Sequence, residues 1–224
     1  MNVTSKQAAD LLRLTWNWLP ARYAHVSRLL GQGIRVERGG RAERALSADL
    51  LRRHALHGLW RREPLPFPWL LEEAEALQAR AFEAGLASHA AALAMQLTRQ
   101  ARLQVAAWLG EAPFMRALQH AAQYPLLAAV QADLVLDETL PERLTQSGAL
   151  LLASLLPQDD GVAQRFLLRF PAPQIVPVPP PPSPEAAAQL QALMAAIPVR
   201  KDTLFDWAWQ EFAKVREVVR EVAQ

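Results

Sequence analysis

The chain has 224 residues, of which 51% are hydrophobic and 21% charged, a balance typical of a folded globular protein rather than a disordered one. It contains no cysteine, which excludes disulfides, thiolate metal sites and cysteine nucleophiles. The net charge of +2 is unevenly spread, because residues 1–62 hold 12 Lys and Arg against four Asp and Glu. Such a basic end attracts an acidic protein, nucleic acid or anionic lipid, or else is a solvated face.

The apolar runs in the sequence are short. The longest, residues 149–156, is well below the roughly 20 residues that a membrane-spanning helix needs. Residues 1–10 are too polar for a secretory signal peptide. We therefore expect a cytosolic protein that does not insert into a membrane and reaches one only through a partner.

Helix signals begin near the N-terminus, where Ser5 is a cap candidate and apolar residues recur with a 3.6-residue period until Pro20. In the first third we expect, in order, that helix, a short helix over 22–30, an exposed mobile loop over 31–44, and a helix over 48–60 capped by Ser47. The loop is expected because glycine and arginine concentrate there without apolar periodicity.

Proline and glycine punctuate the middle of the chain. Prolines 64, 66 and 68 predict a stiff elbow. Gly85 and Gly110 are expected to end helices, and the alanine content of 87–107 favours close helix packing. We expect helices over 69–84, 86–109, 114–122, 126–134 and 142–156. Residues 161–170 fit either a helix or a strand.

Composition changes at Pro171. Eight of the 14 residues from 171 to 184 are proline, which favours an extended polyproline II connector. Two helices are expected after it, over 185–196 and from a cap at Thr203 onward. Because no run of strands is convincing, the sequence predicts an all-α protein. We expect a compact helical core domain over 1–170, the proline-rich connector over 171–184, and a C-terminal helical segment over 185–224.

No constellation with catalytic chemistry stands out. Residues 31–33 hold two glycines but lack the lysine and preceding strand of a phosphate-binding loop. His54 and His57 share a helical face, yet a zinc site wants three or four ligands. The acidic clusters 72–75 and 133–138 lack a supporting His or Arg at a suitable spacing, so surface charge explains them better than acid–base catalysis. We expect neither an enzyme nor a bound metal or cofactor.

Aromatic residues are more suggestive of binding. Seven tryptophans are many for this length, and five lie toward the ends of the chain. Tryptophan and arginine are enriched at interaction hot spots, although core packing is the alternative explanation for each tryptophan. The candidate partner-binding residues are Trp16, Trp18, Arg22, Tyr23, Arg28, Trp207, Trp209 and Phe212.

Several local patterns, in order and at similar spacing, resemble one family. They are Pro20-Ala21-Arg22-Tyr23-Ala24-His25, Arg102-Leu103, Leu109-Gly110-Glu111-Ala112, Arg116, Leu140-Pro141-Glu142, Gln146-Ser147-Gly148, and Arg165 followed by Leu168-Arg169-Phe170-Pro171. The chain resembles the SctK proteins (YscK, MxiK and OrgA relatives), cytosolic sorting-platform subunits of bacterial type III secretion systems. The resemblance covers about residues 19–171, and both 31–44 and the helix beyond Phe205 depart from it.

The resemblance implies a mostly helical, non-enzymatic adaptor at the cytoplasmic face of the inner membrane. Such a subunit links the cytoplasmic forkhead-associated-like domain of the SctD-type ring protein to the SctQ-type pod protein, and thereby indirectly to the stator and ATPase. The motif residues are expected to define the fold rather than touch a partner.

Two hypotheses place the partners. The arginine-rich first third would dock to the ring protein by charge steering, with Trp16, Trp18 and Tyr23 as anchors. The helix that holds Trp207 and Trp209 would contact the pod protein. The rival interpretation is a nucleic-acid-binding regulator that uses the same basic face, although the sequence shows no clear helix-turn-helix or stacking sheet.

Overall fold

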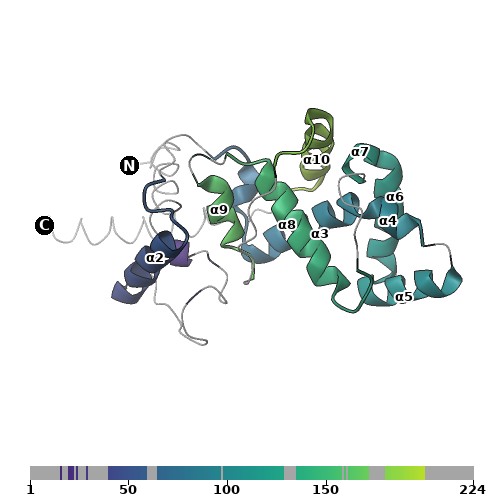
Figure 1. Ribbon diagram of the computed structural model, residues 1–224, viewed down its shortest axis with the longest axis horizontal. Coiled ribbons are helices and arrows are strands. Elements are labelled where there is room, and N and C mark those ends of the chain that lie inside the picture. The colour runs from purple at the N-terminus through teal and green to yellow at the C-terminus, as the bar shows by residue number, and fades with distance from the viewer. Residues whose placement is uncertain are drawn as a thin grey trace, which may run out of the picture. The chain divides into compact units, whose positions relative to one another are not determined.

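The structure, a computed structural model, describes residues 16, 20–22, 24, 29, 40–59, 65–96, 98–128, 135–157, 159, 161–171 and 180–199 (Figure 1). These residues are mostly helical and include no strand, so the predicted all-α fold is confirmed. The expected helices before residue 20, over 22–30 and beyond residue 203 lie outside the described residues, apart from Trp16, Arg22, Ala24 and Leu29, as does most of the proline-rich connector.

Eleven elements are described. They are the 3-10 helices η1 (Pro20–Arg22) and η3 (Pro68–Leu71), and the α-helices α2 (Arg41–Arg53), α3 (Ala74–Ser88), α4 (Ala90–Ala94), α5 (Arg99–Leu109), α6 (Glu111–Gln123), α7 (Pro125–Ala128), α8 (Leu140–Ser154), α9 (Val162–Leu167) and α10 (Pro184–Ala196).

The chain divides into two compact units. The first takes its described residues from 1–76, 158–175 and position 199, and the second from 77–157 and 176–198. This division differs from the expected core domain over 1–170, because α10 packs against α7 within the second unit. Its apolar residues Leu190 and Leu193 are buried there, so 184–196 is an integral part of that unit rather than a separate segment.

Helix α2 begins earlier than expected. Residues 41–44 are helical, which corrects the C-terminal end of the expected loop over 31–44. Ser47, predicted to cap a helix, lies buried inside α2, and its hydroxyl accepts a hydrogen bond from the backbone N–H of Ala21 at 3.2 Å. The capping prediction was wrong because this hydroxyl serves a contact between α2 and η1 instead.

The same helix also ends earlier than the expected residue 60. Ala55 takes a left-handed conformation with φ 53°, and the N–H of Leu56 donates to the carbonyl of Leu51 at 2.7 Å. The N–H of Ala55 donates to the carbonyl of Arg52 at 3.1 Å. These two bonds form a Schellman helix end, in which alanine stands where glycine is usual.

Gly85 was expected to end a helix, but it lies within α3. A Cβ atom at Gly85 would come 1.8 Å from the carbonyl oxygen of Leu144, and one at Gly148 would come 1.7 Å from that of Ala81. Both glycines therefore lie where the backbones of α3 and α8 meet. The prediction that Gly148 permits close packing is confirmed, and Gly85 serves the same contact.

The single helix expected over 86–109 is interrupted. The end of α3, then α4 and α5, occupies this range, and Thr98 caps α5 by accepting a hydrogen bond from the N–H of Ala101 at 3.1 Å. Gly110, with φ 87°, ends α5 as predicted. The open choice at 161–170 resolves as the helix α9.

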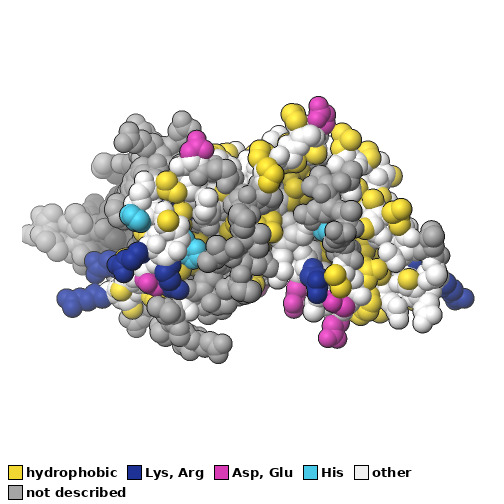
Figure 2. All heavy atoms as spheres, in the orientation of Figure 1, with side chains coloured by type: hydrophobic (Ala, Val, Ile, Leu, Met, Phe, Trp, Pro, Cys, Tyr) yellow, Lys and Arg dark blue, Asp and Glu magenta, His cyan; other side chains and the backbone are white. Residues whose placement is uncertain are grey.

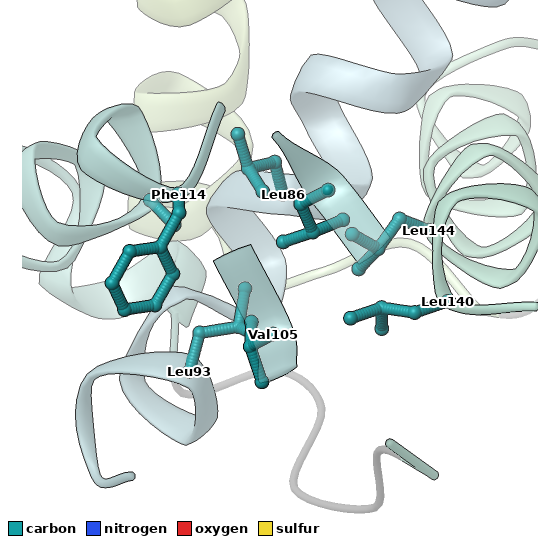
Figure 3. Packing of buried hydrophobic residues seen from close by; sticks show 8 residues of the cluster. Leu86, Leu93, Val105, Phe114, Leu140 and Leu144 are labelled. Atoms are coloured by element: carbon teal, nitrogen blue, oxygen red, sulfur yellow. The ribbon is translucent and has the colours of Figure 1, made fainter. Parts of the chain in front are cut away.

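The second unit is built around an apolar cluster to which five helices contribute, α3, α4, α5, α6 and α8 (Figure 3). Its buried members are Leu86, Leu93, Val105, Leu109, Phe114, Ala117, Leu140 and Leu144. The first unit has a smaller cluster of Leu51, Leu56 and Leu168. Beside it, Trp69 contacts Phe166 edge-on with ring centroids 5.8 Å apart.

Candidate interaction surface

Three arginines share one exposed face of α2. Successive α-helical residues turn by about 100°, so Arg41, Arg44 and Arg52 fall within an arc of about 80°. All three side chains are exposed, as are Ala45 and Ala48 between them. Figure 2 shows dark-blue side chains gathered over α2. We call these three arginines and the two alanines the α2 basic face.

The opposite face of α2 is buried, which fixes the orientation of the helix within its unit. Leu50 and Leu51 are buried, as are Glu43 and Ser47. Leu51 packs with Leu56 in the apolar cluster of this unit, and Ser47 is bonded to Ala21. The α2 basic face therefore points outward, since turning it inward would expose this buried set.

The ion pairs of the described residues leave the arginines of this face out. Arg53 forms an ion pair with Asp49 one turn earlier. Within the described part of the chain, no ion pair reaches Arg41, Arg44 or Arg52. The face can therefore engage an external anion through guanidinium groups that do not first have to break an ion pair with a described residue.

The structure describes only two of the eight residues predicted to bind partners. Trp16 is 3% exposed, an environment that fits core packing, the alternative given for it above. Arg22 lies in η1, where its backbone is described. The other six, Trp18, Tyr23, Arg28, Trp207, Trp209 and Phe212, lie outside the described residues.

The sequence prediction missed the α2 basic face. Arg41 and Arg44 fell in the expected loop, so their shared face with Arg52 was not considered. A helical projection started at Gly40 would have aligned the three arginines. Nothing in the local sequence indicates that start, because the N-cap residue is Gly40, which has no side chain that could accept a capping hydrogen bond.

The second unit holds one cluster of charged groups. Arg116 donates to Oε1 of Glu83 from Nε at 3.0 Å and from Nη2 at 2.7 Å, and His120 Nε2 lies 3.2 Å from the other carboxylate oxygen. Burial raises the pKa of Glu83, but the hydrogen bonds and charges of His120 and Arg116 outweigh it and hold the pKa below its usual 4.5. The cluster joins α3 to α6 and is a stabilising contact.

Buried arginines bind backbone carbonyls in both units. In the first, Arg165 donates to Leu59 O at 2.7 Å, and Arg169 donates to Leu70 O at 2.7 Å. In the second, Arg80 donates to Met194 O and Pro198 O, each at 3.0 Å. The expectation that motif residues define the fold fits the burial of Arg165 and Arg169, which are 1% and 2% exposed.

The acidic clusters differ in part from expectation. Glu73 and Glu75 are exposed, as surface charge should be, but Glu72 is buried. Asp137 pairs with Arg143 at 3.2 Å, a partner that the spacing had not indicated. A hydrogen bond from Thr139 is the main reason that the pKa of Asp137 lies below its usual 3.8, and the charge of Arg143 adds to it.

His89 Nε2 lies 3.0 Å from Ser147 Oγ, so this motif serine links α8 to the junction of α3 and α4. Nowhere in the described ranges do three or more His, Asp or Glu residues gather as a metal ion would require. None of the described helices combines the length and apolarity needed to cross a bilayer.

Comparison with known proteins gives no match. No family model fits the chain, and neither the curated proteins nor the solved structures include one significantly similar to it.

Proposed function

We propose that this chain is a non-enzymatic adaptor of a bacterial type III secretion sorting platform, similar in role to the SctK proteins. It would link the cytoplasmic domain of an SctD-type ring protein to an SctQ-type pod protein. It would lie in the cytoplasm and associate with the inner membrane only through these partners. The observation that carries the proposal is the ordered set of SctK-like motifs between residues 20 and 171.

The positions of the motif residues support this proposal. Gly148 lies at the backbone contact of α3 with α8, and Gly110 turns the chain between α5 and α6. Arg169 donates hydrogen bonds to the carbonyls of Leu70 and Glu72, in the segment that leads into α3. Related proteins need residues with such structural roles in common to share a fold, so a resemblance that includes them is consistent with a shared helical scaffold.

The two-unit organisation suits a linking role. Each unit has its own apolar cluster, so each offers a surface supported by its own packing. The first unit presents the α2 basic face, which can attract an acidic partner by charge steering. In this function the side chains make and break no covalent bond, and the helices present surfaces to neighbouring subunits.

Co-purification tests the proposal. The full-length chain would be mixed with the cytoplasmic domain of the ring protein and with the pod protein from the same genome, separately and together. We expect a complex with each partner, and a ternary complex when all three are present. Binding to neither partner would refute the adaptor function.

The exposed arginines also favour the second candidate, a nucleic-acid-binding regulator. That function predicts an affinity for duplex DNA that falls steeply as salt rises, in proportion to the phosphates neutralised. A gel shift at low salt with the full-length chain separates the two candidates, because the adaptor function predicts no DNA complex under conditions in which the protein partners bind.

A further inference from the structure

We infer that the α2 basic face docks carboxylates of an acidic protein surface, and that Arg41, Arg44 and Arg52 are the residues through which the ring protein binds. The assignment of the partner rests on the proposed adaptor function. The juxtaposition that carries the inference is three exposed arginines on one face of a helix whose opposite face is buried.

The helix dipole and the charge spacing of α2 disfavour two of these arginines. Arg41 and Arg44 lie in the first helical turn, where the helix dipole favours acidic side chains. They also stand three residues apart, where like charges repel. Arg52 lies in the last turn, where a cation is favourable. Glu43 supplies one acidic residue in this turn, but it is buried on the opposite face. Two exposed arginines set against these preferences mark a candidate functional site, since proteins tolerate such conflicts where function requires them.

The surface between the arginines suits a protein partner. Ala45 and Ala48 are exposed and carry only a methyl group, so a partner side chain can pack against the helix between the guanidinium groups. Arginine is enriched at protein interfaces because its planar fork binds a carboxylate through two hydrogen bonds and its stem adds apolar contact. The face therefore offers both an apolar floor and charged donors.

The composition of α2 disfavours nucleic acid as the occupant. The helix has no aromatic side chain on which a base could stack and, apart from its arginines, no Lys, Thr, Asn or Gln to reach phosphates or base edges. Its hydroxyl, on Ser47, is buried. Asp49, which pairs with Arg53, lies beside the arginines at 30% side-chain exposure and offers a phosphate no hydrogen-bond donor. A protein surface can place an apolar or polar group opposite that carboxylate.

The helix also sets the spacing of the complementary groups. With a rise of about 1.5 Å per residue, Arg41 and Arg44 stand about 4.5 Å apart along the axis, and Arg52 lies about 12 Å beyond Arg44. We expect the partner to present acidic side chains over about 16 Å, with two of them close together.

The test measures binding of the full-length chain to the ring-protein domain at low and at physiological salt. The variant is R41E/R44E/R52E, and the matched control is R99E/Q100E/Q104E/Q123E/Q191E, which lowers the net charge by the same amount at exposed positions of the second unit. We expect the α2 variant to bind about 30-fold more weakly at low salt and the control to bind within about threefold of the wild type. Wild-type affinity should fall as salt rises.

Each other outcome has a distinct meaning. If the wild type binds and the α2 variant binds equally well, the α2 assignment is wrong while the adaptor function stands. Equal weakening by the control would show an effect of net charge alone and would also overturn the assignment. If the wild type binds neither ring nor pod protein, both proposals fail. Duplex DNA binding that the α2 variant abolishes, with partner binding intact, would assign the face to nucleic acid.

A second variant guards against misfolding. R41Q/R44Q/R52Q removes the charges while keeping good helix-forming residues on an exposed face. It should weaken binding to the ring protein about 10-fold without changing the circular dichroism spectrum. Unchanged affinity of this folded variant would overturn the assignment even if the glutamate variant fails to fold.

Discussion

The two units of this chain differ in how their described helices pack. The second packs five helices around eight buried apolar residues and brings the backbones of α3 and α8 into direct contact. The first has a described cluster of three buried leucines, and its Arg165 and Arg169 bind carbonyls of segments between α-helices. Arg80 makes the same kind of contact in the second unit. Charge-assisted hydrogen bonds therefore organise irregular backbone in both units, and among the described residues the direct contact of two helix backbones belongs to the second.

The largest effect is expected at the α3–α8 contact. Gly148→Ala places a Cβ atom 1.7 Å from the carbonyl oxygen of Ala81, and because the backbone fixes the positions of both atoms the helices must separate. We expect a loss of more than about 3 kcal/mol in the free energy of unfolding, measured in urea. The control is Gly58→Ala, at a position with nothing within 4 Å, which should change stability by less than about 0.5 kcal/mol. Equal stability of the two variants would contradict backbone contact at Gly148.

The arginine contacts of the first unit should come next. Arg169→Met keeps an apolar stem but leaves the carbonyls of Leu70 and Glu72 without this donor. We expect a loss of about 3 kcal/mol, since each buried carbonyl left unsatisfied costs about 1–3 kcal/mol. Hydrogen exchange would show this loss as faster exchange of the backbone amides near residues 65–72, with the amides of α5 and α6 unchanged. Loss confined to the second unit would contradict the comparison.

Acid should weaken the second unit through Glu83. Its folded pKa lies below the usual 4.5, so the unfolded state takes up a proton first as pH falls. The stability from this carboxylate is present above pH 4.5 and is lost as pH falls through the lower folded pKa. Glu83→Gln should cost about 2 kcal/mol at pH 7 and flatten this acid-side loss in urea unfolding. A variant with the wild-type acid profile would show that Glu83 does not contribute it.

The smallest expected effect is a gain in stability. Ala55 occupies the left-handed position of the Schellman end, with φ 53°, where a Cβ atom costs about 1–2 kcal/mol. Ala55→Gly removes that strain but makes the unfolded chain more flexible, which offsets up to about 1 kcal/mol. We expect a net gain of about 0.5 kcal/mol in the free energy of unfolding. A loss of stability would show that the methyl group makes a contact that matters more than the strain.

Much of the fold follows from patterns in the sequence, and the failures have physical causes. The all-α class, the end of α5 at Gly110 and the packing role of Gly148 were predictable, because helix punctuation and small residues act locally. The end of α2 was not predictable, since Ala55 occupies the left-handed position at which a helix end usually has glycine. At Gly85 the sequence predicted a helix end where there is none, because a glycine needed for a tertiary contact looks the same in sequence as one that ends a helix.

The candidate surface was only partly predictable. The excess of positive charge in the first 62 residues pointed to the region in which α2 lies. Arg41 and Arg44 share a face with Arg52 only because α2 extends back to residue 41, and this part of the helix packs against η1, where Ala21 donates to Ser47 across 26 positions. Contacts between distant residues cannot be read from local spacing.

The interleaving of the two units has a consequence for synthesis. Gln189 of α10 accepts hydrogen bonds from the N–H groups of Leu126 and Leu127, and Arg80 binds carbonyls as far along as Pro198. The start of α7 and the guanidinium of Arg80 therefore gain these partners only after residue 198 has left the ribosome. The first unit also waits, because Arg165 and Arg169 follow the whole of α8. Each unit therefore keeps its early segments without these partners while a segment of the other unit is being made.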